Sequence, residues 1–277
     1  MGALTLTAGL VLITFAIVRT NVNGWGSATT LVPMGVGVAL LAVFLVIEGR
    51  LAQRPLIPLR IFASRTLSAA NVVVFFLGSA VFAMWYFVSL YLQQVLDFSA
   101  IEAGLSFLPM TLAIIIASSF AGRLVARFGA GRLLSAGMAL VGVGMLIFST
   151  LRPDGSYLGD VFVPSLLTAI GIGLSFVPVT IAATAGVDHD DAGLASGLVN
   201  TSRQFGGSLG LAILATVAST HTAGIADGGR ISVSELTSGF HAAFVVGAAF
   251  GLAGALTAGV ALARRPRRGR AAAAARE

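Results

Sequence analysis

The chain has 277 residues, of which 57% are hydrophobic and only 10% are charged. Because soluble domains carry roughly 25% charged residues, this composition excludes an ordinary water-soluble fold. The sequence contains no cysteine, which excludes disulfide bonds, thiol catalysis and cysteine metal sites. The net charge of +6 comes from 17 arginines with no lysine. Their position in short connecting segments and in a tail favours a topological signal over a nucleic-acid-binding face.

Eight long apolar runs divide the chain, and a helix of about twenty apolar residues crosses the hydrocarbon layer of a membrane. Their apolar composition is continuous rather than alternating, which favours transmembrane helices over an outer-membrane barrel. The runs are Gly2–Val18, Leu31–Ile47, Ala69–Leu92, Ala103–Ala121, Leu133–Leu151, Val161–Val187, Ala192–Ser219 and Phe240–Ala263. The sequence therefore predicts an all-α polytopic membrane protein with eight transmembrane helices.

The arginines alternate between the gaps that separate these runs. Fourteen belong to the gaps after the second, fourth and sixth runs or to the tail, if Arg203 is counted with the sixth gap. The other three are Arg19, Arg152 and Arg230. Since cytoplasmic loops retain positive charge, we expect a multi-pass protein of the cell membrane with both termini in the cytoplasm. Residues 264–277 are predicted to be a disordered basic tail that anionic lipid attracts.

The third run carries many aromatic side chains with a few polar groups among them. Such a face suits amphipathic or cationic organic ligands, through stacking and cation–π attraction. An aromatic belt at the membrane interface is the competing interpretation. The candidate substrate-binding residues of this run are Asn71, Phe75, Ser79, Phe82 and Tyr86.

The seventh run contains a single charged residue, Arg203. Small and polar residues recur around it at spacings of three and four, which places them on one stripe of a helix. Asn200, Arg203 and Gln204 are therefore a candidate cytoplasmic gate that faces protein or water. The alternative is that Arg203 extends to the membrane interface while the neighbouring glycines pack against another helix.

Ionisable groups inside a membrane commonly mark proton or substrate pathways, but no carboxylate lies centrally in any of the eight runs. If transport is coupled to protons, we expect the titrating carboxylate to lie outside this chain. The cluster Asp188-His189-Asp190-Asp191 lacks the ligand spacing of known metal sites, and Asp191 is better placed as a helix N-cap. We expect no metal site, no cofactor and no enzymatic activity.

Three stretches resemble the drug:proton antiporters with fourteen transmembrane helices in the major facilitator superfamily. Tyr91–Pro109 (YLQQVLDFSAIEAGLSFLP) resembles the junction of the seventh and eighth core helices. Gly122–Leu134 (GRLVARFGAGRLL) resembles the C-terminal copy of the superfamily's loop motif, and Ala195–Val217 (ASGLVNTSRQFGGSLGLAILATV) resembles the eleventh core helix. The loop-motif residues that match are Gly122, Arg123, Arg127, Gly129 and Arg132.

The resemblance covers essentially the whole chain and implies its domain organisation. Residues 1–68 would be two linker helices and a cytoplasmic loop, and residues 69–263 the six-helix C-terminal bundle of the transporter. The six N-terminal helices of the family are missing from the sequence. Ala126 stands where the loop motif has an acidic residue, so the usual charge-relay gate is not expected. The arginines of the loop can still interact with carboxylates or helix C-termini.

The resemblance implies an efflux transporter that exports hydrophobic or cationic drugs by proton antiport. Its expected partners are a small-molecule substrate, membrane lipid and a separate N-terminal half of six helices, with no nucleic acid. Two alternatives stay open. The chain could be a truncated product or a split-transporter subunit that is inactive without the other half. The full transporter could instead export lipids or antibiotic precursors.

Overall fold

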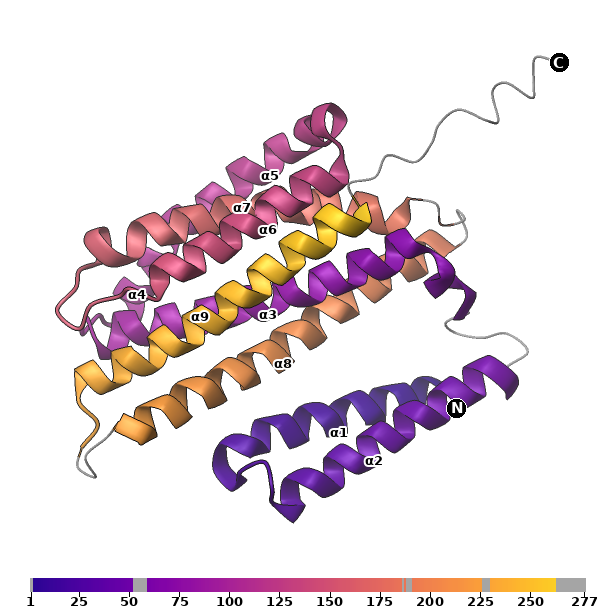
Figure 1. Cartoon of the computed structure of the whole chain (residues 1–277), viewed down its shortest axis with the longest axis horizontal. Coiled ribbons are helices and arrows are strands. Elements are labelled where there is room, and N and C mark those ends of the chain that lie inside the picture. The colour runs from indigo at the N-terminus through magenta and orange to yellow at the C-terminus, as the bar shows by residue number, and fades with distance from the viewer. Residues whose placement is uncertain (1, 52–58, 186, 188–190, 226–229, 263–277) are drawn as a thin grey trace.

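The structure, a computed structural model, is helical almost throughout and describes residues 2–51, 59–185, 187, 191–225 and 230–262 (Figure 1). No strand occurs in these ranges. They contain eight helical spans that are long and apolar enough to cross a membrane. The predicted fold class, all-α with eight candidate transmembrane helices, is therefore confirmed.

The helices follow the predicted runs closely and extend several of them. The α-helices are α1 (Gly2–Asn23), α2 (Ala28–Val46), α3 (Arg65–Gln94), the short α4 (Ala100–Ser106), α5 (Leu108–Phe128), α6 (Ala130–Phe148), α7 (Phe162–Thr184), α8 (Ala192–Ile225) and α9 (Val233–Thr257). Short helical segments are η1 (Ile47–Leu51), η2 (Leu59–Ala63), η3 (Tyr157–Val161) and η5 (Ala258–Leu262).

The fourth span is divided into α4 and α5 by local sequence signals. Ser99 and Glu102 form a capping box at the start of α4, in which the Ser99 hydroxyl accepts the Glu102 N–H and the Glu102 carboxylate accepts the Ser99 N–H. Such reciprocal bonds satisfy donors that a helix start leaves open. Pro109 lies in the first turn of α5, where its missing N–H costs nothing, but it cannot continue the preceding helix.

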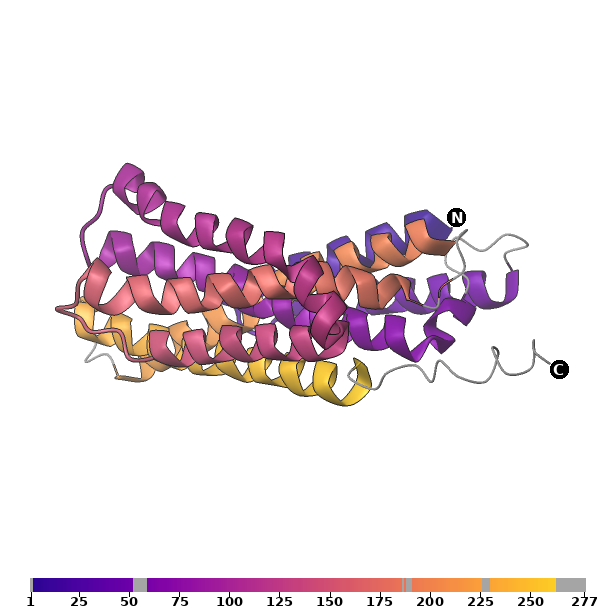
Figure 2. The ribbon, with the colours of Figure 1, turned by 90° about the horizontal axis from the view of Figure 1, so that it is seen from above.

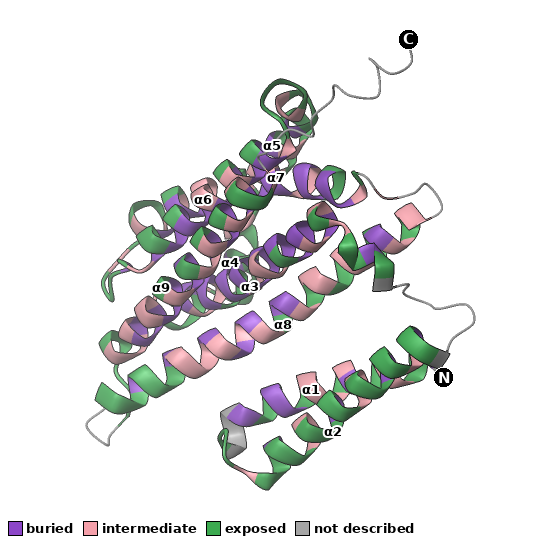
Figure 3. Cartoon of the chain, turned by 45° about the vertical axis from the view of Figure 1, so that its right-hand side comes forward, coloured by how far each residue is buried: buried purple, intermediate pink, exposed green. Residues whose placement is uncertain are grey.

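Helices α3 to α9 form a bundle, and α1 and α2 form a hairpin beside it (Figure 1). In the bundle, α3 packs mainly on α8 and α9, α6 on α7 and α9, and α5 on α7. The hairpin packs mainly on itself and contacts the bundle through α1 and α8. Buried residues gather on α3, α6 and α7, whereas exposed residues are frequent on α1 and α2 (Figure 3). Where α6 ends against α9, the buried rings of Phe148 and Phe244 stack with centroids 5.1 Å apart.

The helices run roughly along one common axis, so consecutive connections lie at opposite ends of the bundle (Figure 2). One end holds the α5–α6 connection and the contact between η2 and the start of α8, where Arg60 and Asp191 form an ion pair of 3.4 Å. The opposite end holds the α6–α7 connection with Arg152 (Figure 1). The arginine-rich and arginine-poor connections therefore lie at opposite ends, as the sequence predicts.

The orientation in the membrane can be tested with thiol labelling, because the natural chain has no cysteine. We expect Arg230→Cys to react with a membrane-impermeant maleimide added to sealed cells. Arg60→Cys should react only after the membrane is permeabilised, because positively charged loops remain in the cytoplasm. Reaction of both variants from the same side of sealed cells would contradict this orientation.

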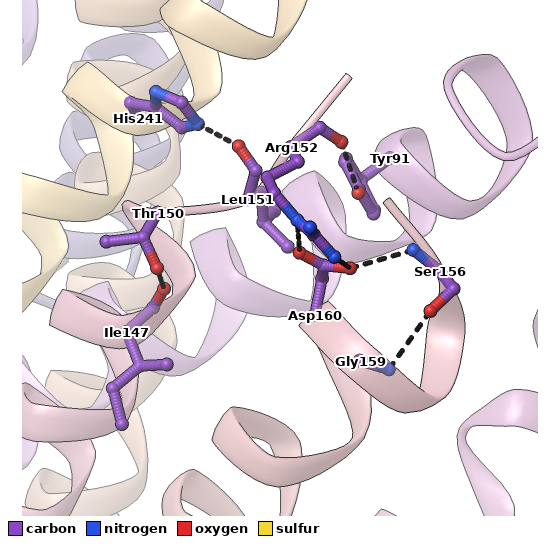
Figure 4. Close-up of polar contacts among 9 residues, drawn as sticks. All are labelled: Tyr91, Ile147, Thr150, Leu151, Arg152, Ser156, Gly159, Asp160 and His241. Atoms are coloured by element: carbon purple, nitrogen blue, oxygen red, sulfur yellow. Dashed lines mark hydrogen bonds and ion pairs between the residues drawn. The ribbon is translucent and has the colours of Figure 1, made fainter. Parts of the chain in front are cut away.

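A hydrogen-bond network holds the arginine-poor end of the bundle together (Figure 4). Tyr91 of α3 donates its hydroxyl hydrogen to the backbone carbonyl of Arg152, at 2.7 Å. The Arg152 guanidinium donates two bonds to Asp160, at 2.9 and 3.1 Å, and these bonds raise the pKa of Arg152 above its ordinary value. His241 of α9 donates from Nε2 to the carbonyl of Leu151, at 2.5 Å. The α6–α7 connection is thus tied to both α3 and α9.

Removal of the Tyr91 hydroxyl tests how much this network stabilises the bundle. We expect Tyr91→Phe to lower the free energy of unfolding by about 1 kcal/mol, because the substitution removes one buried hydrogen bond and leaves the Arg152 carbonyl without it. Thermal unfolding of the purified protein in detergent measures the effect. Tyr86→Phe is the matched control, since Tyr86 is exposed and its hydroxyl makes no hydrogen bond with the described residues. Equal unfolding temperatures for the two variants would contradict the prediction.

Candidate functional site

Small residues bring the backbones of α3 and α8 into close contact. A Cβ atom at Gly206 would collide with the backbone of Phe75, and one at Gly210 would collide with Ser79. On the α3 side, a Cβ atom at Gly78 would collide with the α8 backbone. Lipid provides no hydrophobic drive for helix association, so close packing of small residues has to hold such helices together. We call this contact the α3–α8 seam.

Polar groups within the seam bind each other. Ser79 is fully buried, and its hydroxyl oxygen lies 2.8 Å from the backbone carbonyl oxygen of Gly206. Ser202 donates its hydroxyl hydrogen to Oδ1 of Asn71 at 2.7 Å. Buried polar groups in a membrane need such partners, because lipid offers none. Asn71 and Ser79 therefore connect α3 to α8, and their predicted contact with substrate stays a prediction.

A cavity of about 270 Å³ lies beside the seam, between α3, α7 and α8. We call it the aromatic cavity. Its α3 wall follows one helical face, because residues at these spacings point to the same side. The lining residues are Leu77, Gly78, Val81, Phe82 and Trp85 of α3, Phe176 of α7, and Arg203 and Gln204 of α8. The cavity therefore combines an apolar wall that includes three aromatic side chains with one positive charge.

Arg203 is half-buried and turns toward α7. Its guanidinium donates to Oδ1 of Asn200 at 2.6 Å, and its central carbon lies 5.3 Å from the ring centroid of Phe176. An arginine over an aromatic face is attracted by the negative face of the ring. Arg203 itself therefore lies against α7, whereas Asn200 and Gln204 of the same stripe are exposed. The role of these three residues as a cytoplasmic gate stays a prediction.

A second, smaller cavity of about 170 Å³ adjoins Arg203 on the side of the α8 N-terminus. Its lining is more polar than that of the aromatic cavity and includes hydroxyl groups and an amide. The lining residues are Thr180 and Ala183 of α7, with Ser196, Val199, Asn200 and Arg203 of α8. Arg203 thus contributes to both cavities and lies where they adjoin.

The structure brings together part of the predicted site. Phe82 lines the aromatic cavity with two of the predicted gate residues, Arg203 and Gln204, and the third, Asn200, lines the smaller cavity. The other four predicted binding residues do not line the aromatic cavity. Asn71 and Ser79 lie in the seam, Phe75 packs against Phe205 with ring centroids 6.4 Å apart, and Tyr86 is exposed beside Phe87.

Trp85 and Phe176 line the aromatic cavity and were not selected from the sequence. Trp85 follows Phe82 by three residues, and this helical spacing was a signal that could have identified it. Phe176 lies in an almost wholly apolar helix, so its sequence neighbourhood carried no signal. Its role comes from the position of α7 against α3.

The loop-motif residues lie at the arginine-rich end, around the α5–α6 connection. Gly129 joins the two helices with a φ of +86°, a left-handed value that glycine adopts readily. Arg123, Arg127 and Arg132 are exposed, and none forms an ion pair with another described residue. Gly122 is exposed as well and has open space around its Cα. The role of this loop in gating stays a prediction.

The acidic cluster before α8 is only partly described. Asp191 directly precedes α8 and pairs with Arg60, whereas residues 188–190 lie outside the described residues. The same is true of the predicted basic tail, residues 264–277. In the described ranges, no group of three or more histidine, aspartate or glutamate residues could hold a metal ion.

A family model described as Major Facilitator Superfamily matches residues 1–211 of the chain. The chain belongs to this superfamily. Superfamily proteins are transporters, which agrees with the membrane-spanning helices of this chain. The spans α3 to α9 match a half of the superfamily fold, as the sequence resemblance predicts.

Several superfamily proteins that resemble the chain carry names that refer to antibiotics. Cephamycin export protein CmcT of Amycolatopsis lactamdurans is 40% identical over 91% of this chain and 51% of its own length. Puromycin resistance protein pur8 of Streptomyces alboniger is 33% identical over 89% of this chain and 50% of its own length. The tetracenomycin C resistance and export protein of Streptomyces glaucescens is 32% identical over 77% of this chain and 39% of its own length. The chain spans about half the length of the curated relatives it matches, or less.

Proposed function

We propose that this chain is the C-terminal part of an efflux transporter of the cell membrane. The full transporter exports organic compounds in exchange for protons. The observation that carries this proposal is the aromatic cavity between α3, α7 and α8. In the superfamily, substrate sites lie near the midplane between two helix bundles that rock about them, and this cavity belongs to one such bundle. Similarity to proteins named for antibiotic export supports the direction of transport.

The second half of the transporter comes from a separate six-helix bundle in this proposal. A pocket for a drug-sized ligand has a volume of about 300–1,000 Å³, whereas the aromatic cavity has about 270 Å³. A facing bundle would supply the remaining wall. The α1–α2 hairpin packs mainly on itself, which supports its assignment as the linker pair of the fourteen-helix type.

The residue that couples transport to protons is also expected in the other half of the transporter. Glu48 is buried but lies at the end of the second span, and Asp160 lies in the network at the arginine-poor end. The described spans hold no carboxylate near their centres. We therefore assign the titrating carboxylate to the separate bundle, with both termini of this chain in the cytoplasm.

The cargo fits the lining of the cavity. Phe82, Trp85 and Phe176 offer stacking surfaces for a hydrophobic, aromatic compound. The names of the relatives favour an antibiotic or its precursor over a lipid. The sequence alone predicted hydrophobic or cationic drugs as cargo. The aromatic side chains do not determine the charge of the cargo.

Transport by inverted membrane vesicles tests this function. The chain is fused behind the N-terminal half of the cephamycin export protein, and uptake of labelled cephamycin, puromycin and tetracenomycin C is measured. We expect uptake of at least one compound when the vesicle interior is acidic, and loss of uptake when a protonophore removes the gradient. Uptake that persists without the gradient would contradict proton antiport, and no uptake under either condition would contradict efflux.

The same vesicles test the need for a second half. Vesicles that contain only the 277-residue chain should show no gradient-driven uptake, because one bundle cannot enclose the cargo. Transport by the chain alone would contradict the proposed division between two halves.

A further inference from the structure

Arg203 gives the aromatic cavity a positive charge that its other walls do not balance. Among the eight residues that line the cavity, the remaining seven are apolar, aromatic or, for Gln204, a neutral amide. Charges interact more strongly in a cavity of low dielectric constant than in water. Such a site attracts an anionic ligand and repels a cationic one.

The guanidinium of Arg203 has hydrogen-bond donors left for a ligand. It carries five N–H groups, and one of its nitrogens donates to Asn200 at 2.6 Å. In the described part of the chain, no carboxylate contacts it. Arg60 and Arg152 differ in this respect, because each pairs with an aspartate.

Phe176 lies beside this guanidinium. The Arg203 central carbon lies 5.3 Å from the centroid of the Phe176 ring, a distance at which the cation and the ring attract each other. Arginine binds carboxylates through its edge, with two parallel hydrogen bonds. An arginine that contacts Phe176 and Asn200 and keeps further N–H donors can receive a carboxylate.

The position of Arg203 makes an anion favourable as well. Arg203 is eleven residues beyond the first residue of α8, which corresponds to about 16 Å along the helix axis. A charged group at membrane depth is costly unless it has a partner or reaches water. A bound anion would supply such a partner next to the apolar wall.

We propose that the aromatic cavity binds amphipathic organic anions. The carboxylate of the ligand pairs with Arg203, and its apolar or aromatic body lies against Phe82, Trp85 and Phe176. This inference rests on the proposed export function and narrows its cargo to compounds that carry a carboxylate. It replaces the broader expectation of hydrophobic or cationic drugs.

Binding of three matched probes to the purified chain tests this proposal. The probes are 4-phenylbutyrate, 4-phenylbutanamide and 4-phenylbutylamine, which share one body and differ in charge. The chain is placed in phosphatidylcholine nanodiscs with Trp25→Phe, so that Trp85 in the cavity is the remaining tryptophan and its fluorescence reports binding. We expect the dissociation constant of the carboxylate to be at least tenfold lower than that of the amide, with the amine binding most weakly.

Two variants change the charge of the cavity in different ways. Arg203→Gln should remove the tenfold preference for the carboxylate and change the affinity for the amide less than twofold. Gln204→Glu keeps the arginine and adds a neighbouring negative charge, so it should shift the preference toward the amine. Arg65→Gln removes an exposed arginine at the start of α3 and should leave the preference unchanged. If Arg203→Gln does not fold, Gln204→Glu decides the result.

The outcomes separate this proposal from the proposed function. A carboxylate preference that survives both cavity variants overturns the pairing with Arg203. Tightest binding of the amine to the unchanged cavity overturns an anionic cargo but leaves an export function intact. Binding of no probe overturns the cavity as a ligand site and, with it, the observation that carries the proposed function. Loss of the preference when phosphatidylglycerol is added overturns the proposal, because it identifies a lipid head group as the anion.

Discussion

Gly206→Val is expected to lower the free energy of unfolding by about 3 kcal/mol, or to prevent the protein from accumulating in the membrane. The substitution places side-chain atoms where the backbone of Phe75 lies, and backbone cannot move aside as a flexible side chain can. Overpacking of a tightly packed core costs about 1–3 kcal/mol, and separation of α3 from α8 would also break the bond between Ser79 and the Gly206 carbonyl. The fraction of monodisperse protein and its thermal unfolding measure the effect.

Gly197→Val is the matched control for this prediction. Gly197 lies on the same helix, and a Cβ atom there would meet no other atom within 4 Å. The variant should therefore unfold within a few degrees of the unchanged protein. Equal stability of the Gly206→Val and Gly197→Val variants would contradict the close packing of α3 against α8.

Arg203→Ala is expected to reduce export by the fused transporter at least tenfold. The substitution removes the positive charge of the aromatic cavity and the contact with Phe176. Loss of one partner of a buried charge pair commonly costs about 2–5 kcal/mol in binding, but Arg203 is only half-buried, so we expect the lower part of that range. Initial rates of gradient-driven uptake into inverted vesicles measure the effect.

Two controls accompany the Arg203→Ala measurement. The amount of inserted protein must equal that of the unchanged transporter, so that lost export cannot be attributed to lost protein. Arg65→Ala removes an exposed arginine at the start of α3 and should export at the normal rate. Normal export by the Arg203→Ala variant would contradict a role of Arg203 in binding or passing the substrate.

The spans were predictable because the membrane makes their composition extreme. Each apolar run became a span. Arg203 and Gln204 were identified because polar groups within an apolar helix must face protein or water. Phe82 was identified because it belongs to a cluster of aromatic side chains on α3.

The rest of the site depends on contacts between residues that are far apart in the chain. Asn71 and Ser79 were selected as polar groups for a ligand, but their partners are Ser202 and Gly206, which are 131 and 127 residues away. A single sequence does not show which distant residue satisfies a buried polar group. The contribution of Phe176 to the cavity likewise follows from helix packing rather than from local pattern.

The two contacts that hold α3 suggest how the site stays intact during transport. The seam fixes α3 to α8, and the Tyr91 bond fixes its other end to the α6–α7 connection. Phe82 and Arg203 therefore belong to one packed unit on either side of the aromatic cavity. We expect the bundle to move as a body against its partner, as rocking transport requires.

Cargo protection of a single thiol in the aromatic cavity tests the central claim most directly. Gln204→Cys introduces the thiol into a chain that has no other cysteine, fused to an N-terminal half freed of cysteines. We predict that saturating cargo slows its reaction with a small thiol reagent at least fivefold, while Gly197→Cys, on the same helix but outside the cavity lining, reacts at an unchanged rate. Equal reaction rates with and without cargo at Gln204→Cys, in a transporter that still exports, would contradict the assignment of this cavity as the cargo site.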